Sequence, residues 1–351
     1  MVMPFQKCIQ TWSEMTGVPA ERSVYVYDPI DASLDWLTER GVAVTLGAPP
    51  FSTGHSRPKI TEDELVAGAR GHRALLGASG TYITGQVMDR LPELRFISKL
   101  GIGYEIIDVD AATDRGIMVT NTPAHAEVEP VAEHAIALML GLAKHLHWYS
   151  ASYIAQGGWR SAGHMSLTLR GATVGIIGFG HIGRAVAVRL RPWGARLLAT
   201  DIRPVDVPAG VERVDLGTLL RASDIVSLHV PGRSPGQGPF LDAELLGLLK
   251  PGALLVNTAR GNLIDQAALA RLLHEGRIGG AAVDVYSPEP PRPDDPILTA
   301  PNVLATPHMA AWNAQLRKEM AEMAFANLWT MLTGGVPDHL VNPAVLDRIE
   351  R

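Results

Sequence analysis

The chain has 351 residues, with 31 Lys and Arg against 36 Asp and Glu, a formal net charge of −5 at pH 7, and a single cysteine, Cys8. This length suits two domains of about 100–200 residues each, and a weakly acidic chain without a basic run argues against nucleic acid as a partner. One cysteine excludes an intrachain disulfide and a Cys-x-x-Cys metal site, and no apolar run approaches the ~20 residues that cross a bilayer. We therefore expect a cytoplasmic protein with no membrane, metal or nucleic-acid partner.

After an N-terminal extension of about 22 residues, the first part of the chain alternates short apolar runs with helical stretches. Thr61 and Glu64 form the capping-box pattern of a helix start, and a Pro- and Gly-rich loop at 49–58 precedes it. This alternation predicts a parallel sheet covered by helices on both faces. The predicted strands are 24–27, 42–46, 74–76, 96–100 and 117–120.

A long helical pattern follows, from Pro130 to about Gly157. Val131, Ala135 and Leu138 recur at helical spacing, and the Gly157-Gly158 pair ends the pattern. We expect a single helix here, which spans the two halves of the chain or packs on a partner subunit.

The next strand, 173–177, leads directly into a glycine-rich turn. Gly178, Gly180 and Gly183 give the pattern G-x-G-x-x-G, and 184–190 continues with helical spacing. The first glycine allows a tight turn, the second lets a pyrophosphate approach the backbone, and the third lets the helix pack on the strand. The helix N-terminus then offers N–H groups and the positive end of its dipole to the anion.

A second strand over 195–200 ends in Asp201, eighteen residues after Gly183. An acid at this place accepts hydrogen bonds from the ribose hydroxyls of NAD and repels the 2′-phosphate of NADP. Strand, glycines, helix, strand and acid in this order favour an NAD site over the alternative, a structural turn followed by a surface Asp.

Further strands are predicted at 225–230, 253–257, 281–285 and 303–305, with a last helix over 313–332. The tail beyond this helix has no strand partner in the second half, so we expect it to return to the first. The predicted domains are therefore 1–121 with 311–351, which binds substrate, and 122–310, which binds the cofactor.

Three polar residues follow the late strands of the cofactor domain: Arg260, Glu289 and His308. Ligands bind beyond the carboxyl ends of parallel strands, so these side chains are expected near the nicotinamide. Reduction of a 2-oxo acid needs a cation for the carboxylate, a proton donor for the carbonyl oxygen and an acid that keeps the donor protonated. Taken singly, Arg260 suits a turn cap, Glu289 a solvated loop and His308 a core position, and the three together favour the active-site interpretation.

At these residues the sequence resembles the D-isomer-specific 2-hydroxyacid dehydrogenases, from about Val24 to the C-terminus. The resemblance implies an α/β fold of two doubly wound parallel-sheet domains, a Rossmann cofactor domain and a flavodoxin-like substrate domain. It also implies NAD-dependent interconversion of a 2-oxo acid and a D-2-hydroxy acid, and a homodimer formed by the cofactor domains and the 130–157 helix. The matching segments are 100–104, 131–134, 175–183, 250–253, 257–261, 265–269, 280–286, 289–290 and 306–308.

The resemblance also assigns roles to individual residues. It makes Arg260, Glu289 and His308 catalytic and places Asp284 near the nicotinamide amide. The substrate is expected to contact Arg260, His308 and the backbone N–H groups of Gly101, Ile102 and Gly103. The expected cofactor-binding residues are Gly178, Phe179, Gly180, His181, Ile182, Gly183, Asp201, His229, Val230, Pro231, Thr258, Ala259, Arg260, Asp284, His308, Ala310 and Ala311.

The sequence departs from the family pattern in two places. Ser287-Pro288 replaces the acidic cluster common before the catalytic Glu, and the hinge 121–130 is one residue longer and carries His125, Glu127 and Glu129. Two alternative functions remain: an NAD-sensing corepressor without catalysis, and a dehydrogenase acting on a phosphorus acid. The second would require a lysine in the first-domain loop, where this chain has Ile102.

Overall fold

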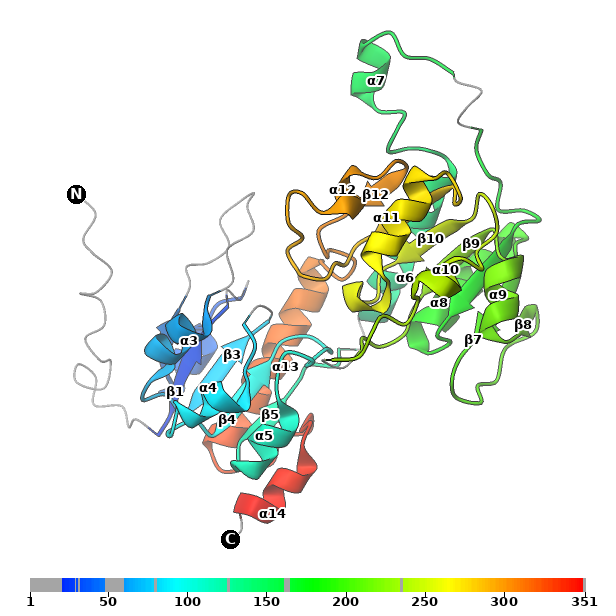
Figure 1. Cartoon of the computed structure of the whole chain (residues 1–351). Helices are drawn as coiled ribbons and strands as arrows, with labels where there is room; N and C mark the ends of the chain where they lie inside the picture. The colour runs from blue at the N-terminus through cyan, green and yellow to red at the C-terminus, as the bar shows by residue number, and fades with distance from the viewer. Residues whose placement is uncertain are drawn as a thin grey trace. The chain divides into compact units, whose positions relative to one another are not determined.

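The computed structural model describes residues 21–28, 30, 32–47, 60–78, 81–124, 127–160, 165–233 and 236–349. The expected N-terminal extension, the 49–58 loop and His125 therefore lie wholly or largely outside the described residues. The chain divides into two compact units, Met1–His125 with Ala314–Arg351, and Ala126–Asn313, where the sequence predicts 1–121 with 311–351, and 122–310. Figure 1 shows the elements of both units.

The first unit is built on a five-stranded parallel sheet in the order β2-β1-β3-β4-β5. This is the flavodoxin-like order, in which the strand order reverses between β1 and β3. The strands are β1 (Ser23–Val26), β2 (Ala43–Leu46), β3 (Ala74–Gly77), β4 (Phe96–Lys99) and β5 (Met118–Thr120).

Helices cover both faces of this sheet because successive residues of a strand point to opposite sides. Tyr25 and Leu75 pack with α3 (Glu62–Ala69), α4 (Gly85–Asp89) and α5 (Val109–Asp114). Val24 and Leu76 face the other way, onto α2 (Asp35–Thr38) and α13 (Ala314–Leu332). Each face therefore buries its own apolar core.

Two local signals in the first unit behave as the sequence predicts. Thr61 and Glu64 form a capping box at α3: the Thr61 N–H donates to Glu64 Oε2 at 2.7 Å, and the Glu64 N–H donates to Thr61 Oγ1 at 3.2 Å. The tail returns to this unit through Asn342, whose side chain accepts from the Val119 N–H and donates to the Ile117 carbonyl, both at 2.9 Å. The short elements η5 (Pro343–Val345) and α14 (Leu346–Ile349) complete the tail.

The second unit has a seven-stranded parallel sheet in the order β12-β11-β10-β9-β6-β7-β8. This is the Rossmann order, which reverses between β6 and β9. Only β8 has no counterpart in the sequence prediction; it is a three-residue edge strand with two exposed side chains. The strands are β6 (Thr173–Ile177), β7 (Arg196–Thr200), β8 (Val211–Arg213), β9 (Ile225–Leu228), β10 (Leu254–Asn257), β11 (Gly280–Val283) and β12 (Val303–Ala305).

This sheet is also covered on both faces. One core contains residues of α9, α10, α11 and α12, and the other contains residues of α6 and α8. The two doubly wound sheets confirm the predicted fold class. The helices are α6 (Val128–Ala143), α8 (His181–Leu190), α9 (Leu216–Ala222), α10 (Ala243–Leu246), α11 (Gln266–His274) and α12 (Pro296–Thr299), with two short turns, η3 (Arg191–Trp193) and η4 (Gly261–Leu263).

The prediction of one helix from Pro130 to Gly157 is wrong. Helix α6 begins at Val128 and ends at Ala143, where His145 adopts a left-handed backbone with φ 53°. The N–H of Leu146 donates to the Gly141 carbonyl at 2.8 Å and that of His145 to Leu142 at 3.1 Å. These two bonds form a Schellman motif, which ends helices even without a glycine at the left-handed position.

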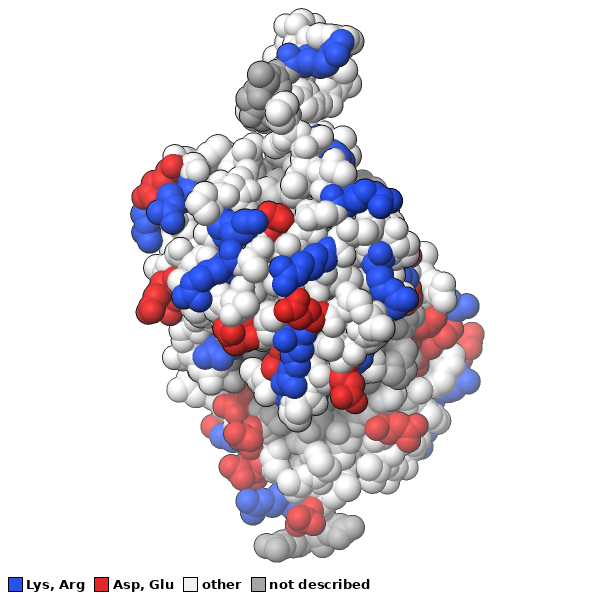
Figure 2. Space-filling view, turned by 90° about the vertical axis from the view of Figure 1, so that its right-hand side faces the viewer, with Lys and Arg blue, Asp and Glu red and all other residues white. Residues whose placement is uncertain are grey.

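After this turn the chain forms an arm with a short helix, α7 (Ala151–Ala155), which extends away from the sheet of the second unit in Figure 1. The arm carries several exposed large apolar side chains: Leu146, Trp148, Ile154, Trp159 and Met165. Over the face that Figure 2 shows, basic and acidic side chains lie interspersed. Within the described residues, no helix has the length and apolar character needed to cross a membrane.

Candidate active site

The glycine-rich turn joins β6 to α8 at the reversal of the strand order. Gly178 has φ 90°, and a Cβ there would overlap the His229 carbonyl. A Cβ on Gly183 would overlap the Gly178 carbonyl, so this glycine permits the close packing of the turn. Gly180 is the N-cap of α8 with no side-chain cap, and a Cβ there would meet nothing within 4 Å. The N-terminus of α8 is thus open for a pyrophosphate.

Asp201 follows β7 and contacts this turn directly. Its Oδ2 accepts the Phe179 N–H at 2.9 Å and its Oδ1 accepts the Arg203 N–H at 2.9 Å. Burial raises the pKa of the Asp201 carboxyl, but these backbone bonds and the Arg203 charge outweigh it and lower the pKa. An ionised carboxylate therefore lies at the place expected for the ribose acceptor.

Other residues beside the turn fit a bound dinucleotide. Thr258 Oγ1 is buried without a hydrogen-bond partner among the described residues, so it is available to a ligand. Burial lowers the pKa of His229 to about 4, and its Nε2 lies 2.9 Å from Ser227 Oγ. Since His229 stays neutral, it adds no charge to the site.

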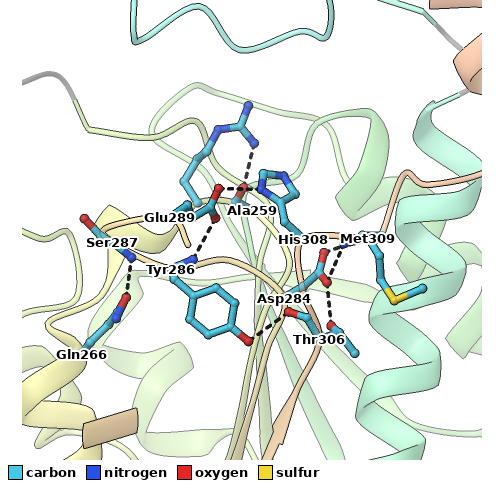
Figure 3. A network of polar contacts seen from close by, with 11 residues as sticks. Ala259, Gln266, Asp284, Tyr286, Ser287, Glu289, Thr306, His308 and Met309 are labelled. Atoms are coloured by element: carbon cyan, nitrogen blue, oxygen red, sulfur yellow. Dashed lines mark hydrogen bonds and ion pairs between the residues drawn. The ribbon is translucent and has the colours of Figure 1, made fainter. Parts of the chain in front are cut away.

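The structure brings Glu289 and His308 together. His308 Nδ1 lies 2.8 Å from Glu289 Oε2, and the other carboxylate oxygen, Oε1, accepts the Tyr286 N–H at 2.9 Å (Figure 3). The Ser287 N–H in turn donates to Gln266 Oε1 at 2.8 Å. Two backbone bonds therefore hold the turn that points Glu289 at the imidazole.

Both groups of this pair shift toward their charged forms. Burial lowers the pKa of His308, but the hydrogen bond and charge of Glu289 outweigh burial and the opposing Arg260 charge, so the pKa is raised. Burial raises the pKa of Glu289, but the His308 hydrogen bond and charge, the Tyr286 N–H and Arg260 outweigh it, so the pKa is lowered. The contact therefore favours the imidazolium form of His308 and the carboxylate form of Glu289.

Arg260 reaches the same pair from the end of β10. Its Nη1 donates to the Ala259 carbonyl at 2.7 Å, and its carbonyl accepts from Asn257 Nδ2 at 2.8 Å. A Cβ on the next residue, Gly261, would overlap the Tyr286 backbone, so this segment packs directly against the segment that leads to Glu289. Arg260 precedes the short turn η4 without capping it through its side chain, which argues against the turn-cap interpretation.

Asp284 lies beneath the loop that carries His308. Its side chain is fully buried; Oδ1 accepts from Thr306 Oγ1 at 2.6 Å and from the Met309 N–H at 2.9 Å, and Oδ2 accepts the Ala310 N–H at 2.9 Å. Burial raises the pKa of Asp284, but these donors together with His134 outweigh it and lower the pKa. The carboxylate therefore holds the loop, while the expected contact with the nicotinamide amide stays a prediction.

The glycine loop of the first unit offers fewer donors than expected. The Gly101 N–H donates to Thr122 Oγ1 at 2.7 Å, so it is already engaged. Among the described residues the N–H groups of Ile102 and Gly103 donate to no acceptor. Lys99 is only 7% exposed, and its Nζ lies 3.7 Å from the position that a Cβ of Gly101 would occupy.

Sequence reasoning missed Lys99, and it also missed the supporting contacts of His134, Thr306, Gln266 and Tyr286. A lysine within an apolar strand is the one signal that marks Lys99. His134 shares a helical face with apolar residues, which hides its polar contacts. Among the unusual hinge residues, Glu129 forms an ion pair with Arg189.

Comparisons with known proteins agree with this geometry. The family model of the D-isomer specific 2-hydroxyacid dehydrogenase NAD binding domain matches residues 136–310. Glyoxylate reductase of Korarchaeum cryptofilum is 42% identical over 271 residues, 75% of this chain and 81% of that protein. D-3-phosphoglycerate dehydrogenase of Archaeoglobus fulgidus is 34% identical over 315 residues, 89% of this chain, which spans only 57% of that protein.

Among solved structures, the TT0316 protein of Thermus thermophilus superposes with a TM-score of 0.80 at 35% identity, over 91% of this chain and 99% of that one. The match extends through both units, so the likeness is not confined to the cofactor domain. The chain therefore belongs to the D-isomer-specific 2-hydroxyacid dehydrogenases, NAD-dependent oxidoreductases that interconvert 2-oxo acids and 2-hydroxy acids.

Proposed function

We propose that this chain reduces a small 2-oxo acid to the D-2-hydroxy acid with NADH, with His308 as the acid. The observation that carries the proposal is the 2.8 Å contact between His308 Nδ1 and Glu289 Oε2. Because Nδ1 is occupied by the carboxylate, Nε2 is the nitrogen that serves the substrate. An acid poised in this way suits an enzyme better than a corepressor that only binds NAD.

A reduced nicotinamide cofactor, held by the glycine-rich turn and Asp201, would supply a hydride to the carbonyl carbon. His308 Nε2 gives its proton to the carbonyl oxygen as negative charge develops there. The neutral imidazole that remains carries its proton on Nδ1, where it donates a hydrogen bond to the Glu289 carboxylate. Glu289 therefore keeps His308 in one tautomer. In the oxidation direction the same Nε2 accepts the hydroxyl proton.

The carboxylate of the substrate needs fixed donors. Arg260 presents a planar guanidinium that binds a carboxylate through two parallel hydrogen bonds. From the first unit, we propose the N–H groups of Ile102 and Gly103 as further donors. The Gly101 N–H donates to Thr122 Oγ1 and so supports this loop, and we do not include it among the proposed donors.

The substrate proposed is glyoxylate or a 2-oxo acid of similar size. A glyoxylate reductase is the 42%-identical relative, and this chain covers 81% of it. The experiment is a panel of glyoxylate, pyruvate, hydroxypyruvate and 3-phosphohydroxypyruvate, each assayed with NADH. The highest kcat/KM is expected with glyoxylate or hydroxypyruvate, and no turnover of any member would refute the proposal.

We further propose that the chain acts as a homodimer in the cytoplasm, with no nucleic-acid partner. The arm that carries α7 supports the dimer, because isolated apolar arms of this kind bury their side chains against a partner. Trp159 is 68% exposed and Met165 is 81% exposed in the single chain. On the face that Figure 2 shows, basic and acidic side chains are interspersed, whereas a nucleic-acid site needs a basic patch.

A further inference from the structure

The loop that presents His308 has an unusual backbone. His308 has φ 52°, one of three non-glycine residues with positive φ among the described residues. This left-handed conformation is unfavourable for a residue with a side chain, and it persists only where the surroundings impose it. The residues that surround this loop therefore determine how the His308 imidazole is oriented.

Asp284 holds His308 in this left-handed conformation through hydrogen bonds to the backbone of the loop. Its backbone carbonyl accepts the His308 N–H at 2.7 Å, while its carboxylate accepts the N–H groups of Met309 and Ala310, each at 2.9 Å. Three consecutive backbone N–H groups thus end on one residue, which clamps the loop. Figure 3 shows Asp284 beneath the imidazole of His308, with Met309 and Thr306 bonded to its carboxylate.

A hydroxyl and a second imidazole complete the clamp. Thr306 Oγ1 lies 2.6 Å from Asp284 Oδ1 and 3.2 Å from His134 Nε2, and His134 Nε2 lies 3.6 Å from Asp284 Oδ1. An ionised carboxylate only accepts, so the single hydroxyl proton of Thr306 points at Asp284. The contact with His134 therefore needs a proton on His134 Nε2, and the chain runs from His134 through Thr306 to Asp284.

His134 brings this donor from a rigid element. It lies on α6, where the neighbouring Ala132 and Ala135 are fully buried in the core beneath the sheet. α6 also packs on β11 and β12, the strands that lead to Asp284 and Thr306. The position of the His134 ring is thus fixed independently of the loop that it contacts.

We propose that His134 is a positioning residue for His308: by donating to Thr306 it orients the hydroxyl on Asp284 and keeps the clamp that holds His308 in its left-handed conformation. The consequence for turnover rests on the proposed function. The consequence for the His308 ring does not, because it concerns the geometry of the ligand-free chain.

Two variants remove the hydrogen bonds that join His134, Thr306 and Asp284, and a third restores part of them. His134→Leu removes the donor, Thr306→Val removes the hydroxyl at almost constant volume, and His134→Gln keeps an amide donor. Glu133→Gln is the matched control, because Glu133 is the exposed neighbour on the same helix. Each variant is compared with wild type by thermal melting, by the Kd for NADH, by kcat and KM, and by NMR titration of the 15N-labelled imidazoles, with His308 assigned from a His308→Ala spectrum.

Loss of the hydrogen bonds that join His134, Thr306 and Asp284 is expected to lower kcat about 10- to 150-fold, the range for one lost hydrogen bond to a charged group, with the Kd for NADH unchanged. The titration of His308 is expected to move to lower pH, because a relaxed loop separates its ring from Glu289. His134→Gln should recover part of both effects, and Glu133→Gln should match wild type.

A lower melting temperature with unchanged kcat and unchanged His308 titration would overturn the proposal, since it would leave His134 only a packing role. If His134→Leu does not fold, the kcat values and His308 titrations of Thr306→Val and His134→Gln distinguish a positioning role from a packing role. If wild type reduces none of the 2-oxo acids, the proposed function fails, while the NMR titration still tests the positioning of His308.

Discussion

His308 and Glu289 form a hydrogen-bonded pair in which Nδ1 and Oε2 lie 2.8 Å apart. The imidazole side chain is about half exposed and the carboxylate about one-third exposed, so the pair lies at the surface of its unit and faces solvent on one side. Arg260 and Asp284 act on the same ring with opposite charges. The net effect is a raised pKa for His308, so the acid that we propose for reduction stays protonated to higher pH.

Replacing Glu289 with Gln tests this electrostatic role. Reduction needs protonated His308, so the rate falls as pH rises through the His308 pKa. Gln keeps the shape but removes the charge, and the pKa of His308 should drop, so the fall in kcat/KM for reduction should begin at lower pH. For oxidation, which needs neutral His308, the rise in rate should also move to lower pH. Superimposable pH profiles for the two proteins would contradict this role.

Removing the imidazole tests the acid itself. His308→Ala should lower kcat by about 10²–10⁴-fold, the range for a lost general acid, with NADH affinity largely retained. Stopped-flow turnover and fluorescence titration with NADH measure the two quantities separately. His274→Ala, at the exposed end of α11, makes the same change away from the site and should behave as wild type. Reduction of the 2-oxo acid by His308→Ala at the wild-type rate would show that His308 is not the acid.

The guanidinium of Arg260 has a distinct expected effect. Arg260→Lys keeps the charge but loses the paired donors that bind a carboxylate through two bonds. We expect a higher KM for the 2-oxo acid together with a lower kcat, because the group both holds the carboxylate and polarises the carbonyl. Arg271→Lys on α11 is the matched control. A change in KM alone would mean that Arg260 only binds substrate.

Much of this site is predictable from sequence because its signals are local. The strand, glycines and helix of the dinucleotide turn, and the acid after the next strand, occupy 173–201. Arg260, Glu289 and His308 are found by a topological rule, since each follows a strand of one parallel sheet. The structure adds the contact that engages His308 Nδ1 with Glu289 and so leaves Nε2 for the proposed proton transfer.

The remaining features depend on contacts or conformations that sequence patterns do not show. His134 meets Thr306 across 172 residues of sequence. The end of α6 rests on a histidine in a conformation that usually takes glycine, so no residue type in the sequence marks the break in the helical pattern. The Gly101 N–H is engaged by Thr122, which lies after a different strand. In each case a tertiary contact or an unusual residue overrides the local expectation.

From the exposed arm that carries α7, we predict a dimer that is stabilised by the apolar side chains of the arm. Trp159→Glu places a charge where a buried contact is expected, and the protein should shift from dimer to monomer in light scattering after size exclusion. Trp193→Glu is the control, because Trp193 is 43% exposed on the same unit but lies outside the arm. A monomeric wild type, or a dimer unaffected by Trp159→Glu, would contradict the proposal that the arm forms the dimer interface.

Asp201 should make the enzyme prefer NADH, because its carboxylate repels the 2′-phosphate of NADPH while accepting ribose hydroxyls. It also accepts the Phe179 N–H, so Asp201→Ala removes both the charge and a support of the glycine turn. Asp201→Asn separates the two: it keeps an oxygen acceptor for that N–H and loses only the charge.

The ratio of kcat/KM for NADH to that for NADPH measures the preference. We expect it to fall in both variants, with the larger loss of NADH affinity in Asp201→Ala. Asp206→Asn, an acid in the same loop, should leave the ratio unchanged. Arg203 tempers the preference, because its side chain is 71% exposed and lies 3.5 Å from Asp201, within reach of a 2′-phosphate. Arg203→Gln should therefore raise the ratio, and equal use of the two cofactors by wild type would show that Asp201 does not select NADH.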